Sequence, residues 1–247
     1  MKGKTWLIPD IHGCSKTLKY LIEEKIKPEK HDHLIFLGDY IDRGPDSKGV
    51  IDFILGLQEK PFRVTTLKGN HEAVCIQTYY EDLKLKSYLG IKSKTTIQKN
   101  WEAYGGNKTL DSFGVKRPRL IPKKYIQWME NLELFVETDD FIAVHAGLNF
   151  NIENPFTDAR SMLWIRDFEV DSKKIRNKKL IHGHVPVNLE LIELSIKSSD
   201  IKFIDLDNGI YMAGKPGYGN LVTLEWESKD FIILPVIDNV TYRYHLP

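Results

Sequence analysis

The sequence has few cysteines and no long hydrophobic segment. Its two cysteines, Cys14 and Cys75, form no CxxC pair, and neither starts a C-x5-R motif. This argues against a small disulfide-based fold and against a cysteine phosphatase mechanism, and it fits a reducing compartment. No stretch approaches the roughly 18 apolar residues of a membrane-spanning helix, and the first apolar run is too short for a signal peptide. We therefore expect a soluble cytoplasmic protein without a membrane partner.

The chain also has little net charge, only +1 over 247 residues. This excludes a polyanion-binding protein as a whole, and we expect no nucleic-acid partner. The charge is uneven, because residues 84–124 contain eleven basic and two acidic residues, which makes this segment +9. We interpret it as a basic helical insertion in a single domain that spans residues 1–247. It is either a solvated face or a guide for an anionic substrate. Trp101 and Tyr104 within it are core anchors or, as the less favoured alternative, a surface on which a base stacks.

The first third of the chain alternates between strand and helix patterns. Residues 4–10, 33–39 and 62–70 read as strands, and the apolar residues of 15–26 and 46–57 recur at helical spacing, with Ser15 and Asp46 as N-caps. Another helix should begin near His71. Such alternation predicts crossover connections and a parallel sheet. The last third has strand-like runs with little helix between the final three, which predicts a second and more antiparallel sheet.

Polar side chains follow each predicted strand at its carboxyl end, where α/β sheets bind their ligands. Asp10 and His12 lie two residues apart, so both can point to one side of an extended chain. Oxygen and imidazole donors without thiolates suit manganese, iron or zinc. Two such ions can share a bridging carboxylate and clamp the oxygens of a phosphoryl group, and Asp39 is the natural bridge. Glu72 should support the helix that follows it, and Asp205 and Asp207 should support a metal ligand.

Five motifs occur in a fixed order between residues 9 and 186, namely PDIHG, GDYIDRG, GNHE, HAG and GHVP. Together they resemble the phosphoprotein phosphatase family of metallophosphoesterases, above all its small bacterial and phage members. The resemblance implies an α/β protein with the calcineurin-like metallophosphoesterase fold, in which two mixed β-sheets are sandwiched between helices. This agrees with the two sheets expected from the strand patterns.

The resemblance also implies a role for each motif residue. One metal ion would be held by Asp10, His12 and Asp39, and the other by Asp39, Asn70, His145 and His184. His71 would be the general acid, held by Asp42. Phosphate oxygens would be bound by Arg43, Asn70 and, less securely, Arg166. His182 neighbours a ligand but belongs to no family role.

These residues predict a phosphomonoesterase with two divalent metal ions, manganese first and iron or zinc as alternatives. A hydroxide that bridges the ions would attack phosphorus directly and in line. The leading substrate is a phosphoprotein or phosphopeptide, on serine or threonine and possibly on tyrosine. The main alternative is a symmetrical dinucleoside polyphosphate hydrolase that acts on diadenosine tetraphosphate. A metal-free, non-catalytic binding scaffold is the remote alternative.

Overall fold

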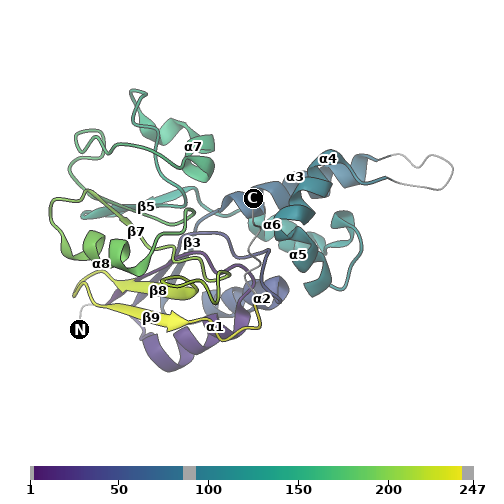
Figure 1. Ribbon diagram of the computed structural model, residues 1–247, viewed down its shortest axis with the longest axis horizontal. Coiled ribbons are helices and arrows are strands. Elements are labelled where there is room, and N and C mark those ends of the chain that lie inside the picture. The colour runs from purple at the N-terminus through teal and green to yellow at the C-terminus, as the bar shows by residue number, and fades with distance from the viewer. Residues whose placement is uncertain (1–2, 86–92, 241–247) are drawn as a thin grey trace.

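The computed structural model describes residues 3–85 and 93–240, which form two β-sheets with helices outside them (Figure 1). The first sheet has the strand order β3-β2-β1-β8-β9 and the second has the order β4-β5-β6-β7. The strands are β1 (Thr5–Ile8), β2 (His33–Phe36), β3 (Arg63–Thr66), β4 (Phe135–Glu137), β5 (Phe141–Val144), β6 (Lys179–His182), β7 (Phe203–Asp205), β8 (Asn220–Glu225) and β9 (Phe231–Pro235). This confirms the predicted α/β architecture, in which two mixed β-sheets lie between helices.

The helices follow the strands along the chain. The α-helices are α1 (Ser15–Tyr20), α2 (Ser47–Gln58), α3 (Asn70–Lys84), α4 (Thr96–Trp101), α5 (Asn107–Ser112), α6 (Lys123–Glu130), α7 (Ala159–Trp164) and α8 (Leu189–Lys197). Shorter π and 3-10 turns are η1 (Leu21–Ile26), η2 (Glu102–Gly106), η3 (Pro118–Leu120) and η4 (Pro155–Thr157). Within the described parts of the chain, no helix has the length and apolar character needed to cross a membrane.

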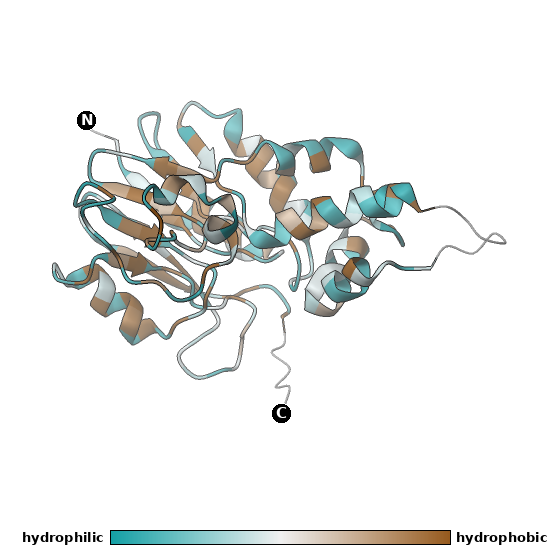
Figure 2. Ribbon diagram, turned by 90° about the horizontal axis from the view of Figure 1, so that it is seen from above, coloured by the Kyte–Doolittle hydropathy of each residue, from teal (hydrophilic) through white to brown (hydrophobic). Residues whose placement is uncertain are grey.

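The alternating side chains of the strands build two separate apolar layers. Along β1 and β2, Leu7 and Ile35 point to the second sheet, whereas Ile8 and Phe36 point to α1 and α2. Successive strand residues face opposite sides of a sheet, so one apolar strand serves both layers. A third cluster covers the outer face of the second sheet beneath α7. Figure 2 shows largely apolar strands inside the molecule and hydrophilic residues over much of the surrounding helices and loops.

Two expectations from the sequence are wrong. The second sheet is mainly parallel, because β5 pairs with β6 and β6 with β7 in parallel; only β4 is antiparallel there. The antiparallel β8–β9 hairpin instead joins the first sheet through β1. The α1 helix has Cys14 rather than Ser15 at its N-cap, since the Ser15 hydroxyl donates to Asp46. Asp46 itself caps α2 as predicted, by accepting from the Gly49 amide.

The basic insertion carries α4, η2, α5 and η3, apart from residues 86–92, which lie outside the described part. These helices extend from one end of the two sheets beside α3 and α6 (Figure 1). Trp101 is only 2% exposed and packs in the core, whereas Tyr104 is 70% exposed. The expectation of a core anchor therefore holds for the tryptophan and fails for the tyrosine.

Candidate metal centre and phosphate pocket

The loops that follow the strands bring the predicted ligands together around Asp39. Its Oδ1 lies 3.5 Å from His145 Nε2, and its Oδ2 lies 3.7 Å from His12 Nε2. Asp39 belongs to both groups of side chains that could hold an ion, one with His12 and His71 and one with His145 and His184. Asp39 therefore lies between the two groups, and its role as a bridging ligand stays a prediction.

Asp10 and Asn70 border these two groups. Asp10 Oδ2 lies 3.8 Å from His12 Nε2, and Asn70 Oδ1 lies 3.0 Å from His145 Nε2. The geometric group around His12 includes His71, for which the sequence predicts a different role. Asp10 nevertheless has the stronger ligand character, because its Oδ2 is buried without a hydrogen-bond partner among the described residues.

The ligand atoms form a set that fits divalent cations. His12 Nδ1 and His145 Nδ1 lie 3.0 and 2.9 Å from the carbonyl oxygens of Ile41 and Leu37, and hydrogen bonds there direct the lone pairs of Nε2 toward Asp39. His145 Nε2 thus faces the oxygens of Asp39 and Asn70, an arrangement that suits a cation between them, whereas His12 Nε2 also contacts Arg43 Nη1. His184 Nε2 is likewise buried without a partner in the described chain. Buried ligands of this kind are the expected signature of a metal site.

Burial keeps the imidazoles of His12 and His184 neutral, and it raises the pKa of the neighbouring carboxyl groups of Asp10 and Asp207. Burial lowers the pKa of His12 well below its usual value and that of His184 to about 3, so both offer free lone pairs. Burial, with Asp207 and Asp39 nearby, raises the pKa of Asp10 well above its usual value. Burial also raises the pKa of Asp207 to about 7. Divalent cations would offset this concentration of buried negative charge.

His71 and Asp42 form a direct pair next to this centre. His71 Nδ1 lies 2.7 Å from Asp42 Oδ2, and His71 Nε2 lies 3.8 Å from Asp39 Oδ2. Burial lowers the pKa of His71, but the charge of Asp39 and the hydrogen bond with Asp42 outweigh it, so the pKa is raised. The ring can therefore carry a proton while its Nε2 faces the reaction site.

The site residues occupy unusual backbone conformations. Nine non-glycine residues of the described chain have positive φ, and five are predicted site residues, namely His12, Asp39, Asp42, Arg43 and His184. Such conformations cost about 1–3 kcal/mol each and cluster where function requires them. Glu72 supports this backbone from inside, because its carboxylate accepts from the amides of Asp39 and Tyr40. The sequence suggested only that Glu72 supports its own helix.

A cavity of about 380 Å³ opens beside the metal centre. Its polar lining includes Arg43, Asn70, His71, Arg166 and His184, which brings both predicted phosphate-binding arginines to one space. Its other wall is apolar and aromatic, with Val74, Ile97, Trp101, Tyr104 and Trp164. The motifs do not contain these aromatic residues, so reasoning from the motifs missed this wall apart from the suggestion that Trp101 and Tyr104 could bind a base.

Tyr211 is a further residue of the site that sequence reasoning missed. The Arg43 guanidinium lies 4.2 Å from the centre of the Tyr211 ring, and Arg43 Nη1 contacts His12 Nε2. The Tyr211 ring also meets the edge of His12. Tyr211 lies in an irregular loop after β7, where no periodic pattern could indicate its position.

Not every predicted neighbour joins the site. His182 Nδ1 lies 3.1 Å from the Gly183 carbonyl oxygen, and its ring packs among Phe168 and Phe203, outside both ligand groups.

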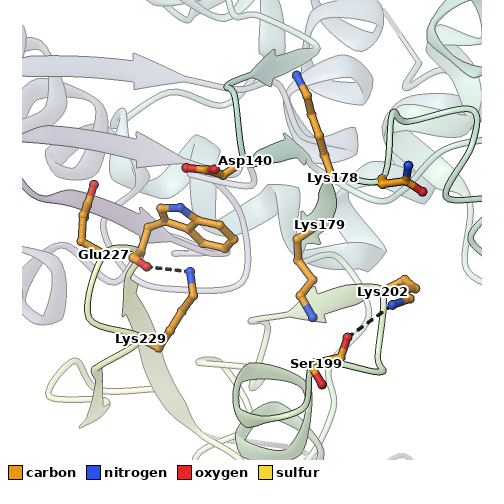
Figure 3. A pocket seen from close by; sticks show the side chains of 9 residues that line it. Asp140, Lys178, Lys179, Ser199, Lys202, Glu227 and Lys229 are labelled. Atoms are coloured by element: carbon orange, nitrogen blue, oxygen red, sulfur yellow. Dashed lines mark hydrogen bonds between the residues drawn. The ribbon is translucent and has the colours of Figure 1, made fainter.

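Another hollow, of about 650 Å³, is lined by Lys178, Lys179, Lys202 and Lys229 (Figure 3). Lys179 begins β6 and His182 ends it, so this hollow lies at the amino end of the strand, opposite the ligand-bearing end.

The comparisons with known proteins agree with this geometry. A family model described as calcineurin-like phosphoesterase matches residues 3–216. The chain belongs to this family. It is therefore a metallophosphoesterase, a family of hydrolases that use divalent metals.

The relatives of this calcineurin-like phosphoesterase carry different names. The symmetrical bis(5'-nucleosyl)-tetraphosphatase of Buchnera aphidicola is 34% identical over 87 residues, which are 34% of this chain and 31% of that protein. Serine/threonine-protein phosphatase 1 of Salmonella typhimurium is 39% identical over 72 residues, 29% of this chain and 31% of that protein. The chain thus matches about a third of the length of these curated relatives.

A solved structure extends the likeness over the whole fold. A protein serine/threonine phosphatase from Saccharomyces cerevisiae superposes with a TM-score of 0.60 at 15% identity, covering 96% of this chain and 81% of that one. At this identity the likeness concerns the fold alone.

Proposed function

We propose that this protein hydrolyses dinucleoside polyphosphates symmetrically, with two divalent metal ions, manganese as the first choice and iron or zinc as alternatives. The observation that carries the proposal is the cavity that joins two arginines and the ligand cluster to an exposed aromatic wall. The arginines and the ligand cluster suit the phosphates of such a substrate, and the aromatic wall suits its flat base. The names of several relatives support the same substrate class.

The metal ions would be held by the residues expected from the motifs. Asp10, His12 and Asp39 would hold one ion, and Asp39, Asn70, His145 and His184 the other. When bound, such ions polarise phosphoryl oxygens and lower the pKa of water, which supplies the nucleophile for hydrolysis. The buried and unpartnered Asp10 Oδ2 and His184 Nε2 support this assignment.

The other side chains would position and protonate the substrate. Arg43 and Arg166, with Asn70, would bind phosphoryl oxygens and stabilise the charge that grows on them. His71 would donate a proton from Nε2 to the leaving oxygen, while Asp42 holds its Nδ1. Tyr104 and Trp164, which are 70% and 44% exposed, would stack against a base.

The products of diadenosine tetraphosphate provide the test. With manganese, symmetrical cleavage yields two molecules of ADP, whereas asymmetrical cleavage yields ATP and AMP. We expect ADP alone, separated by ion-exchange chromatography. Tyr104→Ala and Trp164→Ala should raise KM for this substrate by roughly 5- to 150-fold, since base stacking contributes about 1–3 kcal/mol. Turnover of p-nitrophenyl phosphate should stay unchanged, and Tyr20→Ala, an exposed tyrosine that does not line the cavity, is the matched control.

A serine/threonine phosphoprotein is the second candidate substrate. The match to the Salmonella phosphatase favours it, because this is among the higher identities found. If kcat/KM on a phosphoserine peptide exceeds that on diadenosine tetraphosphate, this second reading replaces the first.

A further inference from the structure

We propose that Trp101, Gly105 and Thr109 of the basic insertion are positioning residues, which hold the Asp42–Arg43 turn in the form that the reaction requires. This inference rests on the proposed phosphoesterase chemistry, in which Asp42 holds the acid His71 and Arg43 binds phosphate. It gives the insertion a part in the reaction that neither its charge nor its exposure would indicate.

The backbone of this turn is strained and is held from outside. Asp42 and Arg43 have φ of 71° and 64°, which L-residues adopt at a cost of about 1–2 kcal/mol each. The Asp42 amide lies 3.0 Å from Thr109 Oγ1, and the Arg43 amide donates to the Gly105 carbonyl at 3.2 Å. Two consecutive strained amides thus bind to groups that lie more than 60 residues away in sequence. The Asp42 amide also lies 3.0 Å from Ser47 Oγ, so the Gly105 carbonyl is the acceptor on which the Arg43 amide depends, and Thr109 shares the Asp42 amide with Ser47.

The carboxylate of Asp42 is oriented by the same helices. Asp42 is fully buried, and its Oδ1 accepts from Thr109 Oγ1 at 2.5 Å. Its Oδ2 accepts from Trp101 Nε1 at 2.8 Å and is paired with His71 Nδ1 at 2.7 Å. The indole and the histidine therefore bind the same oxygen. The tryptophan fixes the plane of the carboxylate that in turn fixes the plane of the imidazole.

Close contact between the insertion and the turn explains the two consecutive glycines. A Cβ on Gly105, whose φ is 112°, would lie 2.6 Å from the Arg43 amide nitrogen. A Cβ on Gly106 would lie 2.3 Å from the Trp101 ring. Side chains at either position would push the insertion off the turn. The same helical segment also supplies Ile97, Asn100 and Tyr104 to the cavity. It therefore contacts both the cavity and the pair formed by His71 and Asp42, called the acid pair below.

The test separates proton donation from general damage by changing the leaving group. p-Nitrophenolate leaves readily without a proton, whereas phenolate depends on the acid. Trp101→Phe keeps a ring but removes the donor to Asp42. With manganese, we expect kcat on phenyl phosphate to fall about 10- to 100-fold, since general acid catalysis contributes about 10²- to 10⁴-fold. On p-nitrophenyl phosphate kcat should fall less than about threefold; the readout is the ratio of the two kcat values and not KM, because Trp101 also lines the cavity.

Two unpartnered donors provide matched controls. Trp6 Nε1 and Thr223 Oγ1 are buried without a hydrogen-bond partner in the described chain. Trp6→Phe and Thr223→Val therefore make the same change of side chain without removing a contact to the turn. We expect neither to alter the ratio of the two rates. Thr109→Val should lower turnover of both substrates, because it removes the donor to Asp42 Oδ1 and one of the two acceptors near the Asp42 amide, and Thr109→Ser should restore it.

The outcomes distinguish this inference from the proposed function. Equal loss on both substrates in Trp101→Phe, or the same small effect as Trp6→Phe, would overturn the positioning role while the phosphoesterase proposal stands. If the wild-type enzyme with manganese cleaves neither diadenosine tetraphosphate nor a phosphate monoester, the proposed function fails and the inference fails with it. If the Trp101→Phe protein does not fold, the positioning role is tested with Thr109→Val and Thr109→Ser, with Thr223→Val as the control. If Thr109→Ser does not restore turnover, the role of the Thr109 hydroxyl is refuted.

Discussion

Replacing Glu72 with alanine should destabilise the protein more than the loss of an ordinary carboxylate. Glu72 is fully buried, and its two oxygens accept from the backbone amides of Asp39, Tyr40, Ile41 and Gly69 at 2.9–3.3 Å. Alanine leaves all four amides without this acceptor. Because three of these amides belong to the loop that carries Asp39 and Arg43, and Gly69 directly precedes Asn70, the loss should reach the candidate metal centre as well.

The magnitude follows from the cost of buried donors without partners. Each unsatisfied amide costs about 1–3 kcal/mol, so four amount to at least about 4 kcal/mol. Removal of the carboxylate offsets part of this cost, since its burial is itself unfavourable: burial, with the charge of Asp39, raises the pKa of Glu72 to about 8. We expect a net loss of about 3 kcal/mol in the free energy of unfolding. For a chain of this size, that lowers Tm by about 6–12 °C.

Guanidinium unfolding followed by circular dichroism measures this loss. The wild type and the variant should both be unfolded in buffer with EDTA, so that weaker metal binding does not add to the difference in their free energies of unfolding. Glu72→Gln keeps one acceptor oxygen and should lose about half as much. Glu193→Ala, at a partly exposed glutamate on α8, is the control and should change stability by less than about 0.5 kcal/mol. If Glu72→Ala unfolds like this control, the amides do not depend on Glu72 and the reasoning is wrong.

Three further predictions concern the metal centre, the glycines and pH. Asp39→Asn should abolish the rise in Tm that Mn²⁺ gives the wild type, because Asp39 belongs to both ligand groups; an undiminished rise would contradict its bridging role. Gly183→Ala should weaken manganese binding measured by calorimetry, since its Cβ would lie 2.4 Å from Asp10 Oδ1. Gly56→Ala places its Cβ where no other atom lies within 4 Å, so it should raise the free energy of unfolding by about 0.5–1 kcal/mol. Burial lowers the pKa of His33 to about 4, so the unfolded chain binds this proton more readily, and stability should fall as pH drops from about 6.5 to 4. Unfolding curves of His33→Gln should show a smaller fall over that range, and an identical pH profile would refute the contribution of His33.

The ligand set could be predicted from the sequence because each ligand follows a strand in a short motif. Parallel strands end at one edge of a sheet, so Asp10, Asp39 and Asn70 had to lie near one another once β1, β2 and β3 were recognised. The pairing of His71 with Asp42 was instead implied by the resemblance to the phosphatase family, because the strand pattern placed Asp42 only after β2. The topology of the last strands was not predictable, because an antiparallel hairpin can extend either sheet with the same alternating pattern.

The aromatic wall and the support of the Asp42–Arg43 turn left no comparable pattern. Tyr104 and Trp164 come from segments about 60 residues apart, and Tyr211 lies in a loop without periodicity. Lysine-rich composition made residues 84–124 read as a solvated or guiding surface, although Trp101 and Thr109 turn inward to a buried carboxylate. Composition averages over a segment, whereas a contact depends on one side of one helix.

This difference has a physical consequence for how the site is built. The proposed metal ligands follow strand ends, which are held by the sheets, so their positions depend on the two central cores. The acid pair and Arg43 depend in addition on α4, η2 and α5, which lie at one end of the molecule (Figure 1). A change in the insertion could therefore alter proton donation and phosphate binding while the metal ligands stay in place. Since the same helices line the cavity, residues 96–109 are where substrate contact and the acid pair are coupled most directly.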